Sequence, residues 1–127
     1  MALGLDHVHL IVRNVDAAVA WFTEYFGATL DQQVEMQGAP QAYMRLGEDR
    51  LLIRAKRPTD GEIRDKGGLE YGTDHFGIHV DDLDGTIARM KAKGVTVTVE
   101  PRMVDPKTQI AFVKGPDGVL IELMHRS

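Results

Sequence analysis

The stretch Asp74-His75-Phe76-Gly77-Ile78-His79-Val80 decides the fold, because it repeats an earlier stretch of the same chain. Asp6-His7-Val8 precedes Asp74-His75-Phe76 by 68 residues. Further positions follow at this offset: Val12 and Val80, Val19 and Ile87, Gln41 and Gln109, Gly47 and Gly115, Leu52-Ile53 and Leu120-Ile121. A period that holds over nearly the whole chain indicates a duplicated structural module.

Each half of the chain predicts one strand, one helix and three further strands. For the first half we expect a strand over 5–13, a helix over 15–26 and strands near 28–36, 41–47 and 49–56. Asn14 supplies N-cap chemistry for that helix and Gly27 ends it. The helical stripe in this half is Val15, Val19, Phe22 and Phe26.

The second half repeats this order with a strand over 73–81, a helix over 83–93 closed by Gly94, and strands near 95–101, 107–114 and 118–125. The sequence therefore predicts an α+β fold in one domain, 1–127. Two tandem βαβββ modules, 4–56 and 73–126, form a concave mixed sheet with one helix covering each module. Residues 57–72, which include Pro58, Gly61, Gly67 and Gly68, are expected to be a linker or flap.

Composition excludes several classes of protein. The chain has 127 residues, 15 basic and 19 acidic side chains, a net charge of −4 and no cysteine. A disulfide scaffold, a zinc–thiolate site and a thiol nucleophile are therefore excluded, and the acidic balance argues against nucleic-acid binding. The sequence shows neither a signal peptide nor an apolar run long enough for a membrane helix. We expect a cytoplasmic protein with a small-molecule partner.

Strand alternation predicts which side chains share the open face of the sheet, opposite the helices. His7 and His9 fall on that face of the first strand, His75 and His79 on that of the fifth, and Glu122 on that of the last. Two imidazoles and one carboxylate are a common ligand set for a divalent metal. We therefore predict His7, His75 and Glu122 as metal ligands. Each of the other two histidines is a candidate proton carrier, or lines the cavity without chemistry.

Three pieces of the sequence resemble the vicinal-oxygen-chelate superfamily, which includes glyoxalase I, methylmalonyl-CoA epimerase, fosfomycin-resistance transferases, extradiol dioxygenases and bleomycin-binding proteins. They are Leu5-Asp6-His7-Val8, the stretch Asp74–Val80 and Gly115-Pro116-Asp117-Gly118-Val119-Leu120-Ile121-Glu122-Leu123. The resemblance implies that His7, His75 and Glu122 hold one divalent ion (Zn, Ni, Fe, Mn or Co), with Glu122 also catalytic. It further implies a homodimer.

One position departs from that resemblance. At the 68-residue offset, the counterpart of Glu122 in the first half is Arg54. Glyoxalase I and the epimerases resemble each other in placing a fourth ligand, Glu or Gln, on that strand. A guanidinium stays protonated and cannot ligate a cation. Arg54 is therefore predicted to bind an anionic substrate, the alternatives being a surface arginine or a salt bridge to an acidic residue.

The resemblance implies a glyoxalase-like lyase or isomerase that acts on a small substrate with adjacent oxygens. Three alternatives stay open: an extradiol-type dioxygenase, a fosfomycin-type thiol transferase and a non-enzymatic drug-binding dimer of the bleomycin-resistance kind. The transferases carry a hydroxyl residue two positions after the first histidine, where this chain has His9.

Overall fold

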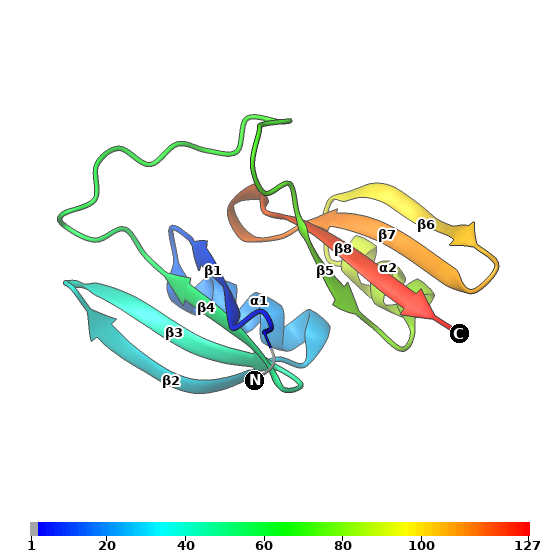
Figure 1. Cartoon of the computed structure of the whole chain (residues 1–127), viewed down its shortest axis with the longest axis horizontal. Coiled ribbons are helices and arrows are strands. Elements are labelled where there is room, and N and C mark those ends of the chain that lie inside the picture. Colours follow the sequence, from blue (N-terminus) through cyan, green and yellow to red (C-terminus); the bar gives the residue numbers. More distant parts are fainter. Residues whose placement is uncertain (1–2) are drawn as a thin grey trace. The chain divides into compact units, whose positions relative to one another are not determined.

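The computed structural model describes residues 3–127 and divides into two compact units, Met1–Arg64 and Asp65–Ser127. Each unit holds one helix and one four-stranded mixed sheet, which confirms the α+β class and the repeated βαβββ order (Figure 1). The first unit comprises β1 (His7–Ile11), α1 (Val15–Phe26), β2 (Thr29–Met36), β3 (Ala39–Leu46) and β4 (Asp49–Arg54). The second comprises β5 (Phe76–His79), α2 (Leu83–Ala92), β6 (Val97–Asp105), β7 (Thr108–Lys114), a 3₁₀ turn (Pro116–Gly118) and β8 (Leu120–Arg126).

The two sheets have the same topology. The strand order is β1-β4-β3-β2 in the first and β5-β8-β7-β6 in the second. In each sheet the first strand pairs in parallel with the last, and the other neighbours are antiparallel. This shared topology is the structural form of the internal repeat.

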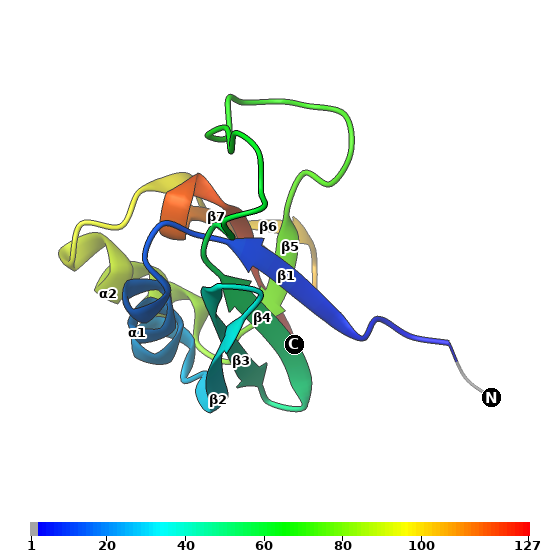
Figure 2. The same cartoon turned by 90° about the vertical axis from the view of Figure 1, so that its left-hand side faces the viewer.

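Helix α1 covers one face of the first sheet, against β3 and β4 (Figure 2). Asn14 caps it by accepting a hydrogen bond from the N–H of Ala17, and Gly27 ends it in the left-handed conformation, both as predicted. Its buried side chains are Val15, Ala18 and Phe22. The predicted stripe was wrong in part, because Val19 and Phe26 are only half-buried and Ala18 takes the buried place.

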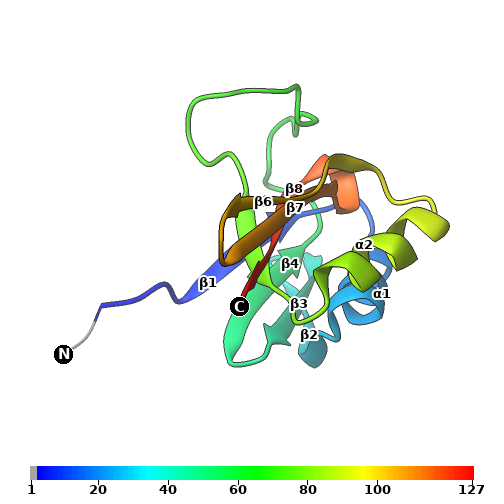
Figure 3. The same cartoon turned by 90° about the vertical axis from the view of Figure 1, so that its right-hand side faces the viewer.

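Helix α2 covers one face of the second sheet (Figure 3). Its buried side chains are Leu83, Ile87 and Met90. Across from the helix, Ile121 and Leu123 of β8 are fully buried. The alternate residues of β8 therefore face away from the helix, so Glu122 lies on the open side of the sheet.

The offset between the two units grows along the chain. Val12 donates its N–H to the carbonyl of Arg54, whereas the counterpart Val80 donates to that of Met124. Arg54 therefore corresponds to Met124 at an offset of 70. The strand pairing two residues earlier gives the same offset of 70. His9 lies beside Leu52, and its counterpart Gly77 lies beside Glu122.

Two parts of the second unit differ from the first. The pairing of β6 with β7 shifts register at three places, whereas the pairing of β2 with β3 shifts at one. The turn Pro116–Gly118 after β7 is one residue longer than the turn Gly47-Glu48 after β3. The counterpart of Glu122 is therefore Leu52, and the prediction that it is Arg54 was wrong.

Residues 55–75 contain neither helix nor strand (Figure 1). This segment begins where β4 ends and leads into β5. Within residues 3–127, neither helix has the length and apolar character that crossing a membrane requires.

Candidate functional site

The second unit brings two of the three predicted metal ligands into contact. The Nε2 atom of His75 lies 3.0 Å from Oε1 of Glu122. Their side chains are 31% and 17% exposed, so both are partly withdrawn from water. The ring of Phe112 meets the imidazole edge-on at 4.8 Å between centroids and closes one side of this pair.

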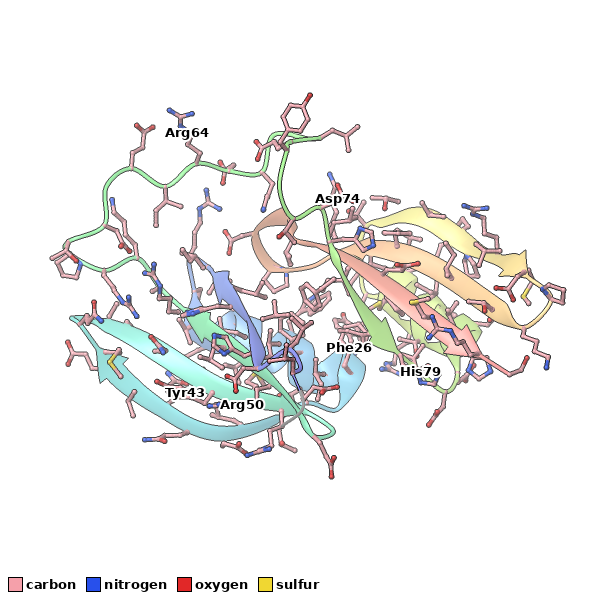
Figure 4. The ribbon with its side chains drawn as sticks, viewed as in Figure 1. Phe26, Tyr43, Arg50, Arg64, Asp74 and His79 are labelled. Carbon is pink, nitrogen blue, oxygen red and sulfur yellow. The ribbon has the colours of Figure 1, made fainter. Side chains whose placement is uncertain are left out.

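Asp74 holds the opposite side of the His75 ring. Its Oδ2 accepts a hydrogen bond from Nδ1 at 2.8 Å, and the residue lies where the chain enters β5 (Figure 4). The hydrogen bond to Asp74 and the interactions with Glu122 raise the pKa of His75, although burial acts in the opposite direction. The pair of carboxylates therefore favours a positive charge at this imidazole.

The first unit repeats half of this arrangement. The Nδ1 atom of His7 lies 2.6 Å from Oδ2 of Asp6. The same carboxylate oxygen accepts a hydrogen bond from Nη1 of Arg50 at 3.3 Å. The hydrogen bond with His7, followed by the charge of Arg50, lowers the pKa of Asp6. The same carboxylate oxygen of Asp6 therefore contacts both His7 and Arg50.

These contacts fit a divalent metal. A metal-ligating histidine usually donates one ring N–H to a carboxylate, which leaves the other nitrogen free for the ion. His7 and His75 both have Nδ1 held in this way. His75 and Glu122 are 3.0 Å apart, the length of a hydrogen bond, and two ligands at about 2.1 Å from an octahedral ion have a similar separation.

The predicted triad is divided between the units. His7 belongs to the first unit, whereas His75 and Glu122 belong to the second. Within residues 3–127, three or more His, Asp or Glu side chains do not gather into one metal-binding group. His75 and Glu122 share the second unit and are in contact there, and the joint action of all three ligands stays a prediction.

Arg54 lies on the open face of the first sheet and has an acidic partner. Its Nη1 donates hydrogen bonds to Oδ2 of Asp60 at 2.7 Å and to the carbonyl of Ala55 at 3.1 Å. Its side chain is 12% exposed. The hydrogen bond from Arg54 and one from the backbone N–H of Arg57 lower the pKa of Asp60. The ion pair that we weighed as an alternative is present, and substrate binding by Arg54 stays a prediction.

Three residues that the sequence did not single out surround Arg54. Nη2 of Arg57 donates to Oε1 of Gln41 at 2.9 Å, and Nε2 of Gln41 donates to the hydroxyl of Tyr43 at 3.0 Å. Gln41 is only 5% exposed and lies beside Arg54 in the β3–β4 register. A polar residue inside an otherwise apolar strand is the signal in the sequence that indicates such a network.

The two candidate proton carriers lie at different places. The ring centroid of His9 is 6.0 Å from that of His7, and burial, with a smaller effect of the charge of Arg54, lowers the pKa of His9. His79 lies at the end of β5 (Figure 4), where its ring centroid is 6.0 Å from that of His125. His125 donates from Nδ1 to the carbonyl of Val80, which gives it a structural role.

Leu52 has on β4 the register position that Glu122 has on β8. It lies beside His9 as Glu122 lies beside Gly77, and it is 7% exposed. An aliphatic side chain offers no lone pair to a metal. The register therefore puts Leu52 where the sequence offset had put Arg54, which lies two residues further along β4.

Replacing Asp74 with asparagine is expected to lower divalent-metal affinity by about 10-fold to 100-fold, because the ring of His75 loses its charged acceptor. A metal-competition titration measures the change. Asp84→Asn, which removes an exposed carboxylate of the same unit, serves as the matched control. An affinity equal to that of the control variant would show that Asp74 has no such role.

Comparison with known proteins places these features in a family context. The model of the Glyoxalase/Bleomycin resistance protein/Dioxygenase superfamily matches residues 4–123. A probable lactoylglutathione lyase from Synechocystis is 41% identical over 125 residues, which cover 97% of this chain and 95% of that protein. A probable chloroplastic lactoylglutathione lyase from Arabidopsis thaliana is 35% identical over 124 residues and 94% of this chain.

A solved structure agrees with these matches. A V278E mutant of glyoxalase I from Zea mays superposes with a TM-score of 0.78 and 26% identity, over 96% of this chain and 44% of that one. The chain spans 35% of the length of the Arabidopsis relative but 95% of that of the Synechocystis relative.

Proposed function

The chain belongs to the Glyoxalase/Bleomycin resistance protein/Dioxygenase superfamily, and from this premise we propose that it is a metal-dependent enzyme of the glyoxalase type. It acts as a lyase or isomerase on a small substrate that presents adjacent oxygens. The observation that carries the proposal is the contact of His75 with Glu122, with the carboxylate of Asp74 behind the ring. The names of the relatives as lactoylglutathione lyases favour this chemistry over the alternatives.

In this proposal His7, His75 and Glu122 hold one divalent ion, of Zn, Ni, Fe, Mn or Co. The ion would supply Lewis-acid stabilisation of a developing oxyanion. Asp6 holds Nδ1 of His7, and Asp74 holds Nδ1 of His75. These contacts fix the two rings and leave each Nε2 on the side away from its aspartate. The two aspartates therefore orient the histidine ligands before the substrate binds.

Proton movement falls to Glu122, His9 and His79. Burial keeps His9 in its neutral form at pH 7, since its pKa lies below the ordinary value of 6.5. A neutral imidazole on the open face next to His7 can accept a proton. Glu122, a proposed ligand whose Oε1 lies 3.0 Å from Nε2 of His75, can act as a second base.

The test of this function combines metal analysis with a substrate panel. The purified full chain, supplemented with each candidate metal, is assayed with α-ketoaldehyde–thiol adducts, catechols and acyl-CoA esters. We expect turnover of the adducts only with metal bound. Turnover of catechols with ferrous iron would indicate the dioxygenase instead, and a chain that takes up no metal would indicate the drug-binding dimer.

Replacing Arg54 with glutamine is expected to weaken the binding of an anionic substrate by about 1.5–3 kcal/mol, the scale of a hydrogen bond to a charged group. The metal content should stay the same or rise, because a nearby cation repels the ion. Steady-state kinetics with the substrate found above measure the change. An unaltered kcat/KM would assign Arg54 to its ion pair with Asp60 alone.

We also propose that the chain forms a homodimer, as the family resemblance implies. Sedimentation equilibrium of the metal-loaded protein at micromolar concentration is expected to give twice the chain mass of 14.1 kDa. A fully metal-loaded monomer would contradict the proposal.

A further inference from the structure

The end of β4 carries more positive charge than its partners neutralise. Arg54 and Arg57 are both guanidinium groups, which stay protonated at any physiological pH. Asp60 is the carboxylate that contacts both residues, through Nη1 of Arg54 and the backbone N–H of Arg57. The cluster formed by these three residues therefore has a net charge of +1, although the Arg54 side chain is largely buried.

One strong donor in this cluster is unused. The Nε–H of Arg57 is buried, and it has no hydrogen-bond partner within the part of the chain that the structure describes. Its Nη2 is held by Gln41, which is itself fixed through Tyr43. A buried donor without an acceptor is costly, and the fixed guanidinium plane presents it in a constant direction.

We propose that Arg54 and Arg57 form an anion-binding site that takes a carboxylate or phosphate group. A planar guanidinium matches both groups and binds them through charge-assisted hydrogen bonds. A bound anion would accept from the free Nε–H of Arg57 and neutralise the residual charge. Asp60 is an internal carboxylate on the same arginines, so it competes with the anion.

The register of the first sheet places this site relative to His7. Arg54 lies beside Ile11 on β1, four residues from His7, which lies beside Arg50. Four residues of strand correspond to about 13 Å. If His7 is a metal ligand, which rests on the proposed function, the backbone positions of the two places lie about 13 Å apart on the sheet, and a substrate that contacts both is extended.

The experiment uses the metal-free full chain, so that its outcome does not depend on the proposed catalysis. Inorganic phosphate and succinate are titrated separately at constant ionic strength, and NMR follows the Nε–H signals of the arginines. We expect saturable shifts at Arg54 and Arg57. Tighter binding of succinate would identify a carboxylate as the natural group, and tighter binding of phosphate a phosphate ester.

Variants separate the site from general charge attraction. Arg57→Gln is expected to lower affinity for the tighter probe by at least about tenfold, through loss of a charged donor. Asp60→Asn is expected to raise it by about tenfold, because the internal competitor loses its charge. Arg45→Gln and Asp31→Asn are matched controls, since they alter an Arg–Asp ion pair of the same sheet and should leave affinity unchanged.

Two results would overturn the proposal. One is the absence of saturable shifts at Arg54 and Arg57 in the wild-type chain with both probes, a measurement that requires no variant to fold. The other is an equal loss of affinity in Arg57→Gln and Arg45→Gln, which would show that the anion responds only to the total positive charge of the sheet and not to a specific site. Circular dichroism of each variant establishes that it is folded.

Discussion

Replacing Glu122 with alanine is expected to lower the affinity for a divalent metal by at least about 100-fold, the upper end of what even indirect contacts to a metal contribute. The substitution removes the carboxylate that lies 3.0 Å from Nε2 of His75, whereas Asp74 still holds Nδ1. Metal content after dialysis and a competition titration measure the loss.

Glu100→Ala is the matched control for this change. Glu100 is a glutamate of the same unit whose exposed ion pair with Lys91 has little influence on stability. His7→Ala and His75→Ala should resemble Glu122→Ala if all three are ligands. Metal content in these three variants equal to that of the control would remove the ligand assignment.

Replacing Leu52 with glutamate is expected to raise metal affinity by about tenfold, whereas Arg54→Glu should not raise it comparably. Leu52 has the same register position relative to His7 that Glu122 has relative to His75. A carboxylate at position 52 would therefore occupy the equivalent place beside His7. The position is buried, so the free energy of unfolding should fall by about 1–3 kcal/mol. Metal competition and urea denaturation measure the two effects.

The comparison between these two variants tests the structural register against the constant sequence offset. An offset of 68 residues predicts that Arg54→Glu creates the fourth ligand, because it aligns position 54 with Glu122. The hydrogen bonds of Val12 and Val80 predict that position 52 does. Higher metal affinity in Arg54→Glu than in Leu52→Glu would contradict the register assigned to β4.

Local patterns in the sequence were sufficient for the order of elements. Asn14 and Gly27 bound α1 because capping depends on a side chain and on a backbone conformation within the same turn. Alternation along β1 and β8 placed His7 and Glu122 opposite the helices, because a strand has a strict period of two residues. Each of these inferences uses neighbours in the chain only.

The sequence by itself determined the duplicated βαβββ order, the helix ends and the face of each sheet that carries its polar residues. Only the tertiary structure decided that Leu52 corresponds to Glu122, since register shifts in the sheets and a longer turn after β7 move the pairing by two positions without changing the face. It also decided that Asp60 pairs with Arg54 and that Gln41 holds Arg57. Such contacts depend on the path of backbone turns and on rotamers, and neither is encoded in a periodic pattern.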